Sequence, residues 1–278
     1  MFLPLPDDFH AHLRQGDLMP GYVRDLVSQF GRAIIMPNTV PAMTSAKAIA
    51  EYKAQILDAA KDVRPDFEPL MTFKLNPNYT EQDLKDMMAA GVVAGKYYPA
   101  GVTTNSADGI SDFEAVFPVV AMMEKLGLVL CVHGEEPGEF CLDREPAFIK
   151  RVETLAAKFP KLKIVFEHLS SAKSVEAVKR LPANVAATFT VHHLMMSPTI
   201  SSETPSGRTT FANRCRSGLK TVPRSAKPPS AATRSSFSAR TPPRTSWARR
   251  NVRAGRRAST ALPWPSRCWY RNSRKPAT

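Results

Sequence analysis

Long apolar runs are missing from this sequence. None of its 278 residues lies in a run that approaches the roughly 18 apolar residues of a membrane-spanning helix. The N-terminus also lacks the basic segment and apolar stretch of a secretory signal. Cysteine is scarce, and its spacing gives neither a CxxC pair nor a disulfide framework. The cysteines are Cys131, Cys141, Cys215 and Cys268. These absences predict a reduced, cytoplasmic protein with no membrane partner.

Acidic residues and histidines are nearly absent from the last part of the chain. The whole sequence carries 38 Lys+Arg and 25 Asp+Glu, a formal net charge of +13, but Glu203 is the only acidic residue after residue 196. All six histidines precede it. Residues 197–278 are rich in Ser, Thr, Pro and Arg and have no apolar run long enough to build a core. We therefore expect a folded domain over residues 1–196 and a disordered basic tail over residues 197–278.

Short apolar runs alternate with longer amphipathic segments up to about Met196, a pattern typical of a parallel sheet with helical crossovers. The predicted strands are 9–13, 33–37, 68–73, 92–98, 128–133, 163–168 and 185–191. The predicted helices are 45–61, 80–91, 110–127, 145–159 and 171–181, and several begin at a Ser, Thr or Asp cap. Seven strands in this length fit either a doubly wound sheet or most of an eight-unit barrel.

Polar side chains at the strand ends favour the barrel. His12, Asn38, Lys96, His133 and His168 each lie at or just beyond the end of a different predicted strand. In a barrel these ends meet at one mouth, whereas the outer strands of an open sheet are too far apart to share a site. The sequence therefore predicts an α/β protein with a TIM-type (β/α)8 barrel that lacks its eighth strand.

Four histidines can meet in that mouth. His10 and His12 alternate along one strand, so both rings project from the same face. His133 and His168 end two other strands. Two nearby histidines alone are more often ordinary core or surface residues. Four imidazoles that face one cavity, in contrast, form a ligand set suited to a borderline metal such as Zn²⁺.

Lys96 interrupts the apolar strand VVAGKYY, where an ammonium group is costly to bury. One interpretation is that the stem is buried while the amine reaches the surface. The other is that a deprotonated amine reacts with CO₂ to give a carbamate, which is anionic, bidentate and able to bridge two metals. Four imidazoles and one bridging carbamate are a suitable ligand set for two Zn²⁺.

Five segments carry a family resemblance: FHAHLR (9–14), MPNT (36–39), GKYYPAGVTTNS (95–106), VHGE (132–135) and EHLS (167–170). Together they resemble the bacterial dihydroorotases of the amidohydrolase superfamily. The HxH pair is shared by many amidohydrolases, but FHAHLR followed by MPNT and GKYYPAG is specific. The resemblance covers residues 3–196 and implies a (β/α)8 barrel enzyme, usually a homodimer. It also implies that the enzyme interconverts N-carbamoyl-L-aspartate and L-dihydroorotate in pyrimidine synthesis.

The resemblance implies two zinc ions bridged by N6-carboxylated Lys96. His10 and His12 would join Lys96 at the more buried ion, and His133 and His168 would join it at the second ion. His192 and His193 follow the last predicted strand and are interpreted as structural, because this ligand set is already complete.

The resemblance also implies residues that hold the substrate. Arg14 and Asn38 would grip its carboxylate, and an arginine fork suits that bidentate task. Thr103 and Thr104 would lie in a loop that closes over the substrate through hydroxyl contacts.

The aspartate that the family uses to move a proton is missing. In the family it follows the eighth strand in a segment like LGTDSAPH, and no such segment follows Met196. The codons of residues 235–245 can, however, be read in a neighbouring frame. Each new codon then takes the third base of one codon and the first two bases of the next. The new triplets can spell FFLGTDSAPH. We therefore interpret residues 197–278 as a shifted reading frame that begins near Ser197, and the catalytic residue of this chain stays unknown.

Other functions remain open on sequence alone. A hydantoinase-like or allantoinase-like cyclic-amide hydrolase would use similar metal ligands, and a zinc-binding remnant without turnover would keep them. The basic tail, with Trp247, Trp264 and Trp269 among its arginines, is also compatible with nucleic-acid binding through phosphate contacts and stacking. The frame-shift interpretation makes such binding the weaker alternative.

Overall fold

Seven parallel strands form a nearly closed barrel, so the predicted fold class is confirmed. A computed structural model describes residues 5–103, 106, 108–191, 193 and 259–261. The strands are β1 (Asp7–Ala11), β2 (Arg32–Ile35), β3 (Glu68–Lys74), β4 (Val92–Tyr97), β5 (Val129–Val132), β6 (Lys163–Phe166), β7 (Val185–Thr190) and β8 (Ser259–Ala261).

Each strand from β1 to β7 pairs in parallel with the next strand along the chain. Lys96 in β4, for example, pairs with Lys74 of β3 and with Cys131 of β5. Parallel neighbours place all their carboxyl ends at one rim. Side chains that follow different strands therefore meet there although they are far apart in sequence.

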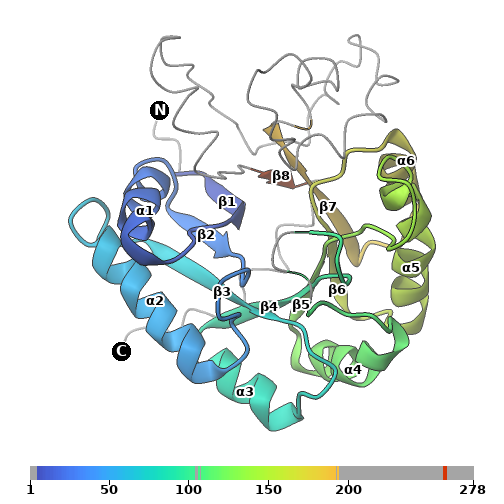
Figure 1. The fold of residues 1–278 in the computed structure, drawn as a ribbon, viewed down its shortest axis with the longest axis horizontal. Helices are drawn as coiled ribbons and strands as arrows, with labels where there is room; N and C mark the ends of the chain where they lie inside the picture. The colour runs from blue at the N-terminus through green and yellow to red at the C-terminus, as the bar shows by residue number, and fades with distance from the viewer. Residues whose placement is uncertain (1–4, 104–105, 107, 192, 194–258, 262–278) are drawn as a thin grey trace.

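The short strand β8 occupies the place beyond β7, but it runs antiparallel. Thr188 pairs with Ala261 and Thr190 with Ser259. In Figure 1, β8 lies between β7 and β1. No parallel eighth strand is found in the part of the chain that the structure describes. The remainder of the predicted tail lies outside the described residues.

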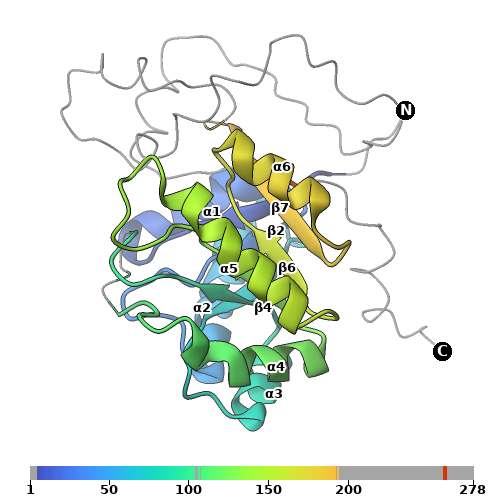
Figure 2. The same cartoon turned by 90° about the vertical axis from the view of Figure 1, so that its right-hand side faces the viewer.

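Helices cover the outside of the barrel, as Figures 1 and 2 show for α2 to α4 below the strands and for α5 and α6 beside β6 and β7. The α-helices are α1 (Met19–Val27), α2 (Ala46–Ala60), α3 (Glu81–Ala89), α4 (Phe117–Leu126), α5 (Arg144–Lys158) and α6 (Ala172–Arg180). Two 3-10 turns, η1 (Gly16–Leu18) and η2 (Glu114–Val116), precede α1 and α4.

Polar caps fix where several helices begin. The side chain of Ser45 accepts a hydrogen bond from the backbone N–H of Ala48 in the first turn of α2, and that of Ser171 accepts from Lys173 in the first turn of α6. Thr80 and Asp83 form a reciprocal capping box at the start of α3. At the end of α4, Gly127 adopts φ 74°, a left-handed conformation that glycine takes without strain.

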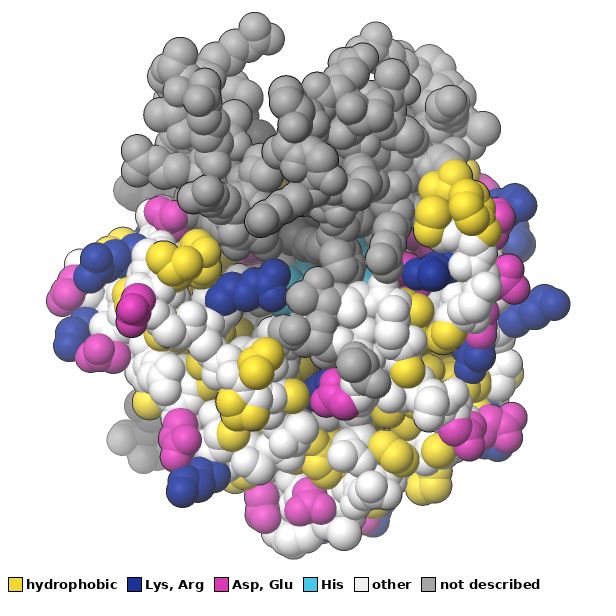
Figure 3. Space-filling model, in the orientation of Figure 1, with side chains coloured by type: hydrophobic (Ala, Val, Ile, Leu, Met, Phe, Trp, Pro, Cys, Tyr) yellow, Lys and Arg dark blue, Asp and Glu magenta, His cyan; other side chains and the backbone are white. Residues whose placement is uncertain are grey.

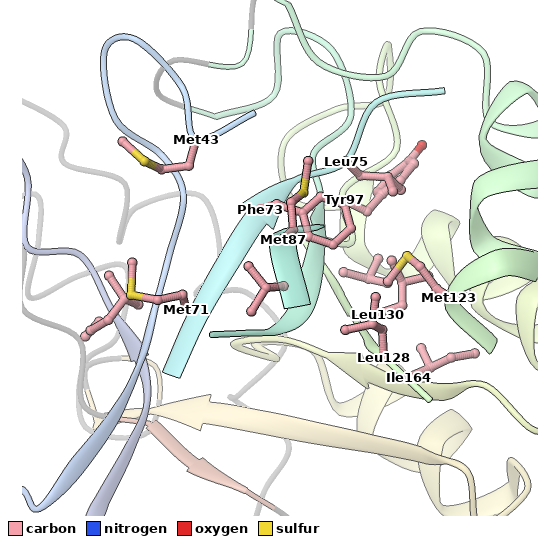
Figure 4. Close-up of a cluster of buried hydrophobic side chains, with 14 of the residues drawn as sticks. Met43, Met71, Phe73, Leu75, Met87, Tyr97, Met123, Leu128, Leu130 and Ile164 are labelled. Carbon is pink, nitrogen blue, oxygen red and sulfur yellow. The ribbon is translucent and has the colours of Figure 1, made fainter. Parts of the chain in front are cut away.

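The main core lies between the barrel wall and these helices. In the cluster drawn in Figure 4, Phe73, Leu130 and Ile164 from three strands pack near Met87 of α3 and Met123 of α4. All five side chains are buried. Burial on this scale fixes the order of the strands and so the positions of the residues that end them.

The sequence-based elements differ from the structure in three places. The sequence pattern predicts neither α1 nor β8, which lies in the segment expected to be disordered, and the predicted helix 110–127 becomes a 3-10 turn followed by α4. The first residues of this predicted helix are not helical, because Ile110 forms a β-bridge with Pro99. No helix in the described ranges is long and apolar enough to cross a membrane.

Candidate metal centre

Four histidines lie at the carboxyl ends of three strands. His10 is in β1 and His12 follows that strand, while His133 follows β5 directly and His168 lies two residues beyond β6. His10, His133 and His168 are buried, and His12 is half-buried. Figure 3 shows histidine side chains near the centre of this face of the molecule. The structure thus brings the four predicted imidazoles together.

The four rings form two pairs. The Nε2 atoms of His10 and His12 are 3.1 Å apart, and Nδ1 of His133 lies 3.0 Å from Nε2 of His168. The His10 and His168 ring centroids are 5.2 Å apart, so the pairs are adjacent. In each pair one ring nitrogen of each imidazole faces the other, which is the arrangement that two ligands of one ion require.

Lys96 in β4 has a side chain that is 0% exposed and shares a neighbour, Glu167, with His10. Its Nζ atom contacts the carboxylate of Glu167 and lies 5.3 Å from the centroid of the Tyr98 ring. Tyr98 in turn packs near His133. The amine therefore does not reach the surface, and the interpretation in which it emerges from the barrel is wrong for this chain.

Two buried glutamates stand behind the histidines. Nδ1–H of His10 donates to Oε1 of Glu167 at 2.9 Å, and Nε2–H of His133 donates to Oε1 of Glu135 at 2.9 Å. A carboxylate on one ring nitrogen fixes the tautomer and leaves the other nitrogen free to bind a metal. The sequence pattern alone assigns these glutamates no role, although both stand in the motifs VHGE and EHLS. The available signal was a charged residue within two positions of a histidine at the end of a buried strand.

The segment that carries His168 is held by a further carboxylate. His168 has φ 46°, which is unusual for a residue other than glycine. Its backbone N–H donates to Oγ1 of Thr188 at 2.8 Å. Beyond it, the backbone N–H groups of Ser170 and Ser171 donate to the carboxylate of Glu145. Burial raises the pKa of Glu145 to about 7, because desolvation outweighs these hydrogen bonds.

Two buried groups flank the first and third histidines. Asp8 accepts a hydrogen bond from the backbone N–H of His10 at 2.9 Å, and burial raises its pKa to about 7. Gly134 separates His133 from Glu135, and a Cβ atom at this position would overlap the ring of Phe166. Glycine is therefore required there by the neighbouring strand β6.

The predicted carboxylate-binding residues lie on two linked loops. Arg14 follows β1 with φ 60°, and its carbonyl accepts a hydrogen bond from Tyr52 at 2.6 Å. Asn38 is buried in the loop after β2. The backbone N–H of Val40 donates to Oε1 of Gln15 at 2.7 Å. This bond joins the segment of Arg14 to the segment of Asn38.

Thr103 lies in the loop after β4, and Thr104 lies outside the described residues. The loop is closed at its base, where Ile110 N–H donates to the Tyr98 carbonyl at 2.8 Å. Within it, Thr103 N–H donates to Oγ of Ser106 at 3.0 Å. An ion pair between Lys74 of β3 and Asp108 holds the loop against the barrel rim.

His193 lies next to this cluster, with a ring centroid 6.2 Å from that of His168. It is buried, and its Nδ1 lies 2.7 Å from Oγ1 of Thr190. That contact supports its interpretation as a structural residue. His192 lies outside the described residues.

The donor set fits zinc. Metal-ligating atoms of His10 and His168, one from each pair, lie within 4.8 Å of each other and of the Glu167 carboxylate, so the two pairs form one cluster. Two imidazole nitrogens bound at about 2.1 Å to one tetrahedral Zn²⁺ lie about 3.4 Å apart. The observed separations of 3.1 Å and 3.0 Å in the two pairs are close to that value. Neutral imidazoles and carboxylates are also the ligands that Zn²⁺ takes in proteins.

A barrel with histidines gathered at the carboxyl ends of its strands is the architecture of a metal-dependent hydrolase. The chain belongs to the amidohydrolase family, whose model matches residues 8–198. Within that family it is similar to curated dihydroorotases. It is 47% identical over 195 residues to the enzyme of Shewanella halifaxensis and 45% identical over 193 residues to that of Teredinibacter turnerae. These matches cover 69% and 68% of this chain and 56% of each relative.

Solved structures give the same result. The dihydroorotase of Campylobacter jejuni superposes with a TM-score of 0.67 at 38% identity, over 71% of this chain and 58% of the other. The dihydroorotase of Saccharomyces cerevisiae, solved with 5-fluoroorotic acid, gives 0.65 at 32% identity, over 73% and 59%. The chain thus spans little more than half the length of these relatives. The comparisons therefore establish the amidohydrolase family of the chain.

Proposed function

We propose that the protein derives from a dihydroorotase that interconverts N-carbamoyl-L-aspartate and L-dihydroorotate with two zinc ions. The observation that carries this proposal is the convergence of two imidazole pairs beside the buried side chain of Lys96. The identity of 47% to a curated dihydroorotase supports it. The parent enzyme would act in cytoplasmic pyrimidine synthesis and would be a homodimer.

The residues present would hold the ions as two sites that share one group. His10 and His12 would bind the first ion, His133 and His168 the second, and Lys96, once carboxylated, would bridge them. When bound, the ions would polarise the amide carbonyl and activate water for attack on it. A carbamate suits this position because it would place a negative charge between two cations, whereas an unmodified lysine would place a positive ammonium group there.

Arg14 and Asn38 would orient the substrate by its carboxylate. A guanidinium binds a carboxylate through two parallel hydrogen bonds, so it fixes direction as well as position. The bond between Gln15 and Val40 holds the two loops in register. Thr103 would contact the substrate from the loop that Lys74 and Asp108 hold at the rim. These contacts would present the ring amide to the ions and exclude water from the other side.

No residue of this chain is assigned as the donor of the proton that the leaving nitrogen needs. The aspartate segment of the family does not occur in frame after Met196. We therefore propose that the chain retains the metal and carboxylate sites and has lost turnover, and that the tail over residues 197–278 is a shifted frame. The end of the family match at residue 198 supports this boundary.

A paired assay tests the proposal. The present chain and a version with the restored frame would each be loaded with zinc and bicarbonate and assayed on L-dihydroorotate, hydantoin and allantoin. We expect the restored version to hydrolyse dihydroorotate, and the present chain to bind zinc with little turnover. A restored enzyme that prefers hydantoin or allantoin would contradict the substrate assignment.

A further inference from the structure

Glu167 joins three strands at the base of the metal centre. It follows β6, is 1% exposed and is flanked by the end of the strand and by His168. One carboxylate oxygen, Oε1, lies 2.9 Å from Nδ1 of His10 in β1, and the other, Oε2, contacts Nζ of Lys96 in β4. A single buried anion therefore contacts two groups of the first proposed zinc site from behind.

The contact with His10 decides which ring nitrogen can bind a metal. A carboxylate accepts only, so the hydrogen of His10 lies on Nδ1 and the lone pair lies on Nε2. Nε2 is the atom that faces His12 at 3.1 Å. Without an acceptor at Nδ1, the ring could place its hydrogen on Nε2 and would turn a donor, not a ligand, toward the ion.

Carboxylation would leave Lys96 with a donor that can still contact Glu167. In that step the neutral amine attacks the carbon of CO₂, a C–N bond forms, the π electrons of one C=O bond move to oxygen, and one N–H proton leaves to water. The carbamate nitrogen keeps one hydrogen. That hydrogen can donate to Oε2 of Glu167, and the hydrogen bond would then fix the plane of the carbamate and so the directions of its two oxygens.

We propose that Glu167 is a positioning residue that orients His10 and carboxylated Lys96 at the same time. The inference rests on the proposed two-zinc function and assigns Glu167 no contact with the substrate. Glu135 is the matched comparison, because it is buried and its carboxylate accepts from His133, a member of the other imidazole pair.

The test compares the full chain with its Glu167→Gln and Glu135→Gln variants. Two quantities are measured without any assay of turnover: bound zinc per chain across a series of buffered free-zinc concentrations, and the carbamate signal in ¹³C NMR after labelling with ¹³C-bicarbonate at saturating zinc. Glutamine keeps the shape of the side chain but carries an NH₂ group that cannot accept.

We expect Glu167→Gln to weaken zinc binding by about 10- to 100-fold, the usual range for a carboxylate behind a metal ligand, and to reduce the carbamate signal. Glu135→Gln should weaken zinc binding to a similar extent and keep the carbamate signal. Glu167→Asp retains the charge but is one methylene shorter, so it should give an intermediate loss. If circular dichroism shows that the Glu167→Gln variant is unfolded, the Glu167→Asp variant takes its place in the comparison.

Two results would overturn the inference. Zinc binding and a carbamate signal equal to the wild type in the folded Glu167 variants would show that the carboxylate orients neither group. Equal loss of the carbamate signal in the Glu167→Gln and Glu135→Gln variants would show that Glu167 has no special relation to Lys96. A wild-type chain that takes up neither zinc nor label is a different outcome, because it overturns the proposed metal function itself.

Discussion

His133 and His168 lie on neighbouring strands, 35 residues apart in sequence, with Nδ1 of one 3.0 Å from Nε2 of the other. The ring of His133 is also held by Glu135, and the backbone of His168 is held by Thr188. These contacts support the arrangement in which one nitrogen of each ring faces the other.

Replacement of one member of this pair should remove one ion. In a His168→Ala variant the second site keeps only His133 and the bridging group, too few protein ligands for tight zinc binding. We expect bound zinc to fall from two ions to one per chain, as measured by metal analysis after dialysis. His193→Ala is the control, because His193 is buried beside His168 but belongs to neither pair. Two ions retained in His168→Ala would contradict the assignment.

Glu145 should make stability depend on pH. Its pKa rises from 4.5 in the unfolded chain to about 7 in the folded protein, because the carboxyl is buried. The folded state then binds more protons between these values, so the free energy of unfolding falls as pH rises through this window. A shift of this size corresponds to about 3 kcal/mol.

A Glu145→Gln variant checks this pH dependence. Urea unfolding of both metal-free proteins between pH 4.5 and 7.5 should show a steeper decline in the free energy of unfolding for the wild type than for the variant. Asp8, whose pKa is also about 7, is present in both proteins, so its contribution cancels in the difference. Parallel curves for the two proteins would rule out a raised pKa at Glu145.

Gly134 should tolerate no side chain while Phe166 stays in place. We expect Gly134→Ala to destabilise the fold by about 1–3 kcal/mol, because the new methyl group overlaps the ring of Phe166. Chemical unfolding measures this loss. Gly21→Ala is the control, since its site in α1 has open space and alanine favours a helix by about 0.5–1 kcal/mol. A second change, Phe166→Leu, should restore part of the stability; no recovery would argue against this clash.

Arg14 should bind the substrate carboxylate through two parallel hydrogen bonds from its guanidinium group, and not through its positive charge alone. In the enzyme with the restored frame, Arg14→Lys keeps the charge but loses bidentate binding, so kcat/KM for dihydroorotate should fall by about 10- to 100-fold. Zinc content should not change. An unaltered kcat/KM would remove Arg14 from the carboxylate site.

The reading frame can be checked directly. We expect the DNA across codons 190–250 to contain an inserted or deleted nucleotide near Ser197, relative to a frame that encodes LGTDSAPH. The amidohydrolase match ends at residue 198, next to this point. Resequencing of the gene is the measurement. Clean reads that encode the present tail in frame, without such a change, would end this hypothesis.

Strand positions could be predicted because buried strands of a parallel barrel are apolar, and the seven predictions overlap β1 to β7. Helix α1 was missed because Pro20 and Gly21 stand in its first turn. Yet Met19, Val23 and Leu26 give it a buried face at helical spacing. Proline is tolerated there because the first N–H groups of a helix have no partner inside it.

The histidines could be predicted because each ends or adjoins an apolar run. Glu167 could not be assigned in the same way, since its role depends on the barrel bringing the end of β6 near the end of β1, and its partner His10 is 157 residues away. Its neighbour His168 was found from strand position alone. The sequence indicates which residues lie at the ends of strands. Which of the nearby glutamates accept hydrogen bonds from the histidines depends on how the strands are arranged in the barrel.

Strand β8 has a consequence for association between molecules. It covers the outer hydrogen-bonding side of β7 from Thr188 to Thr190. An uncovered strand edge is a template on which a strand of another molecule can add. Trimming the chain back to residue 196 would therefore free these amides for intermolecular pairing, and self-association should increase with protein concentration.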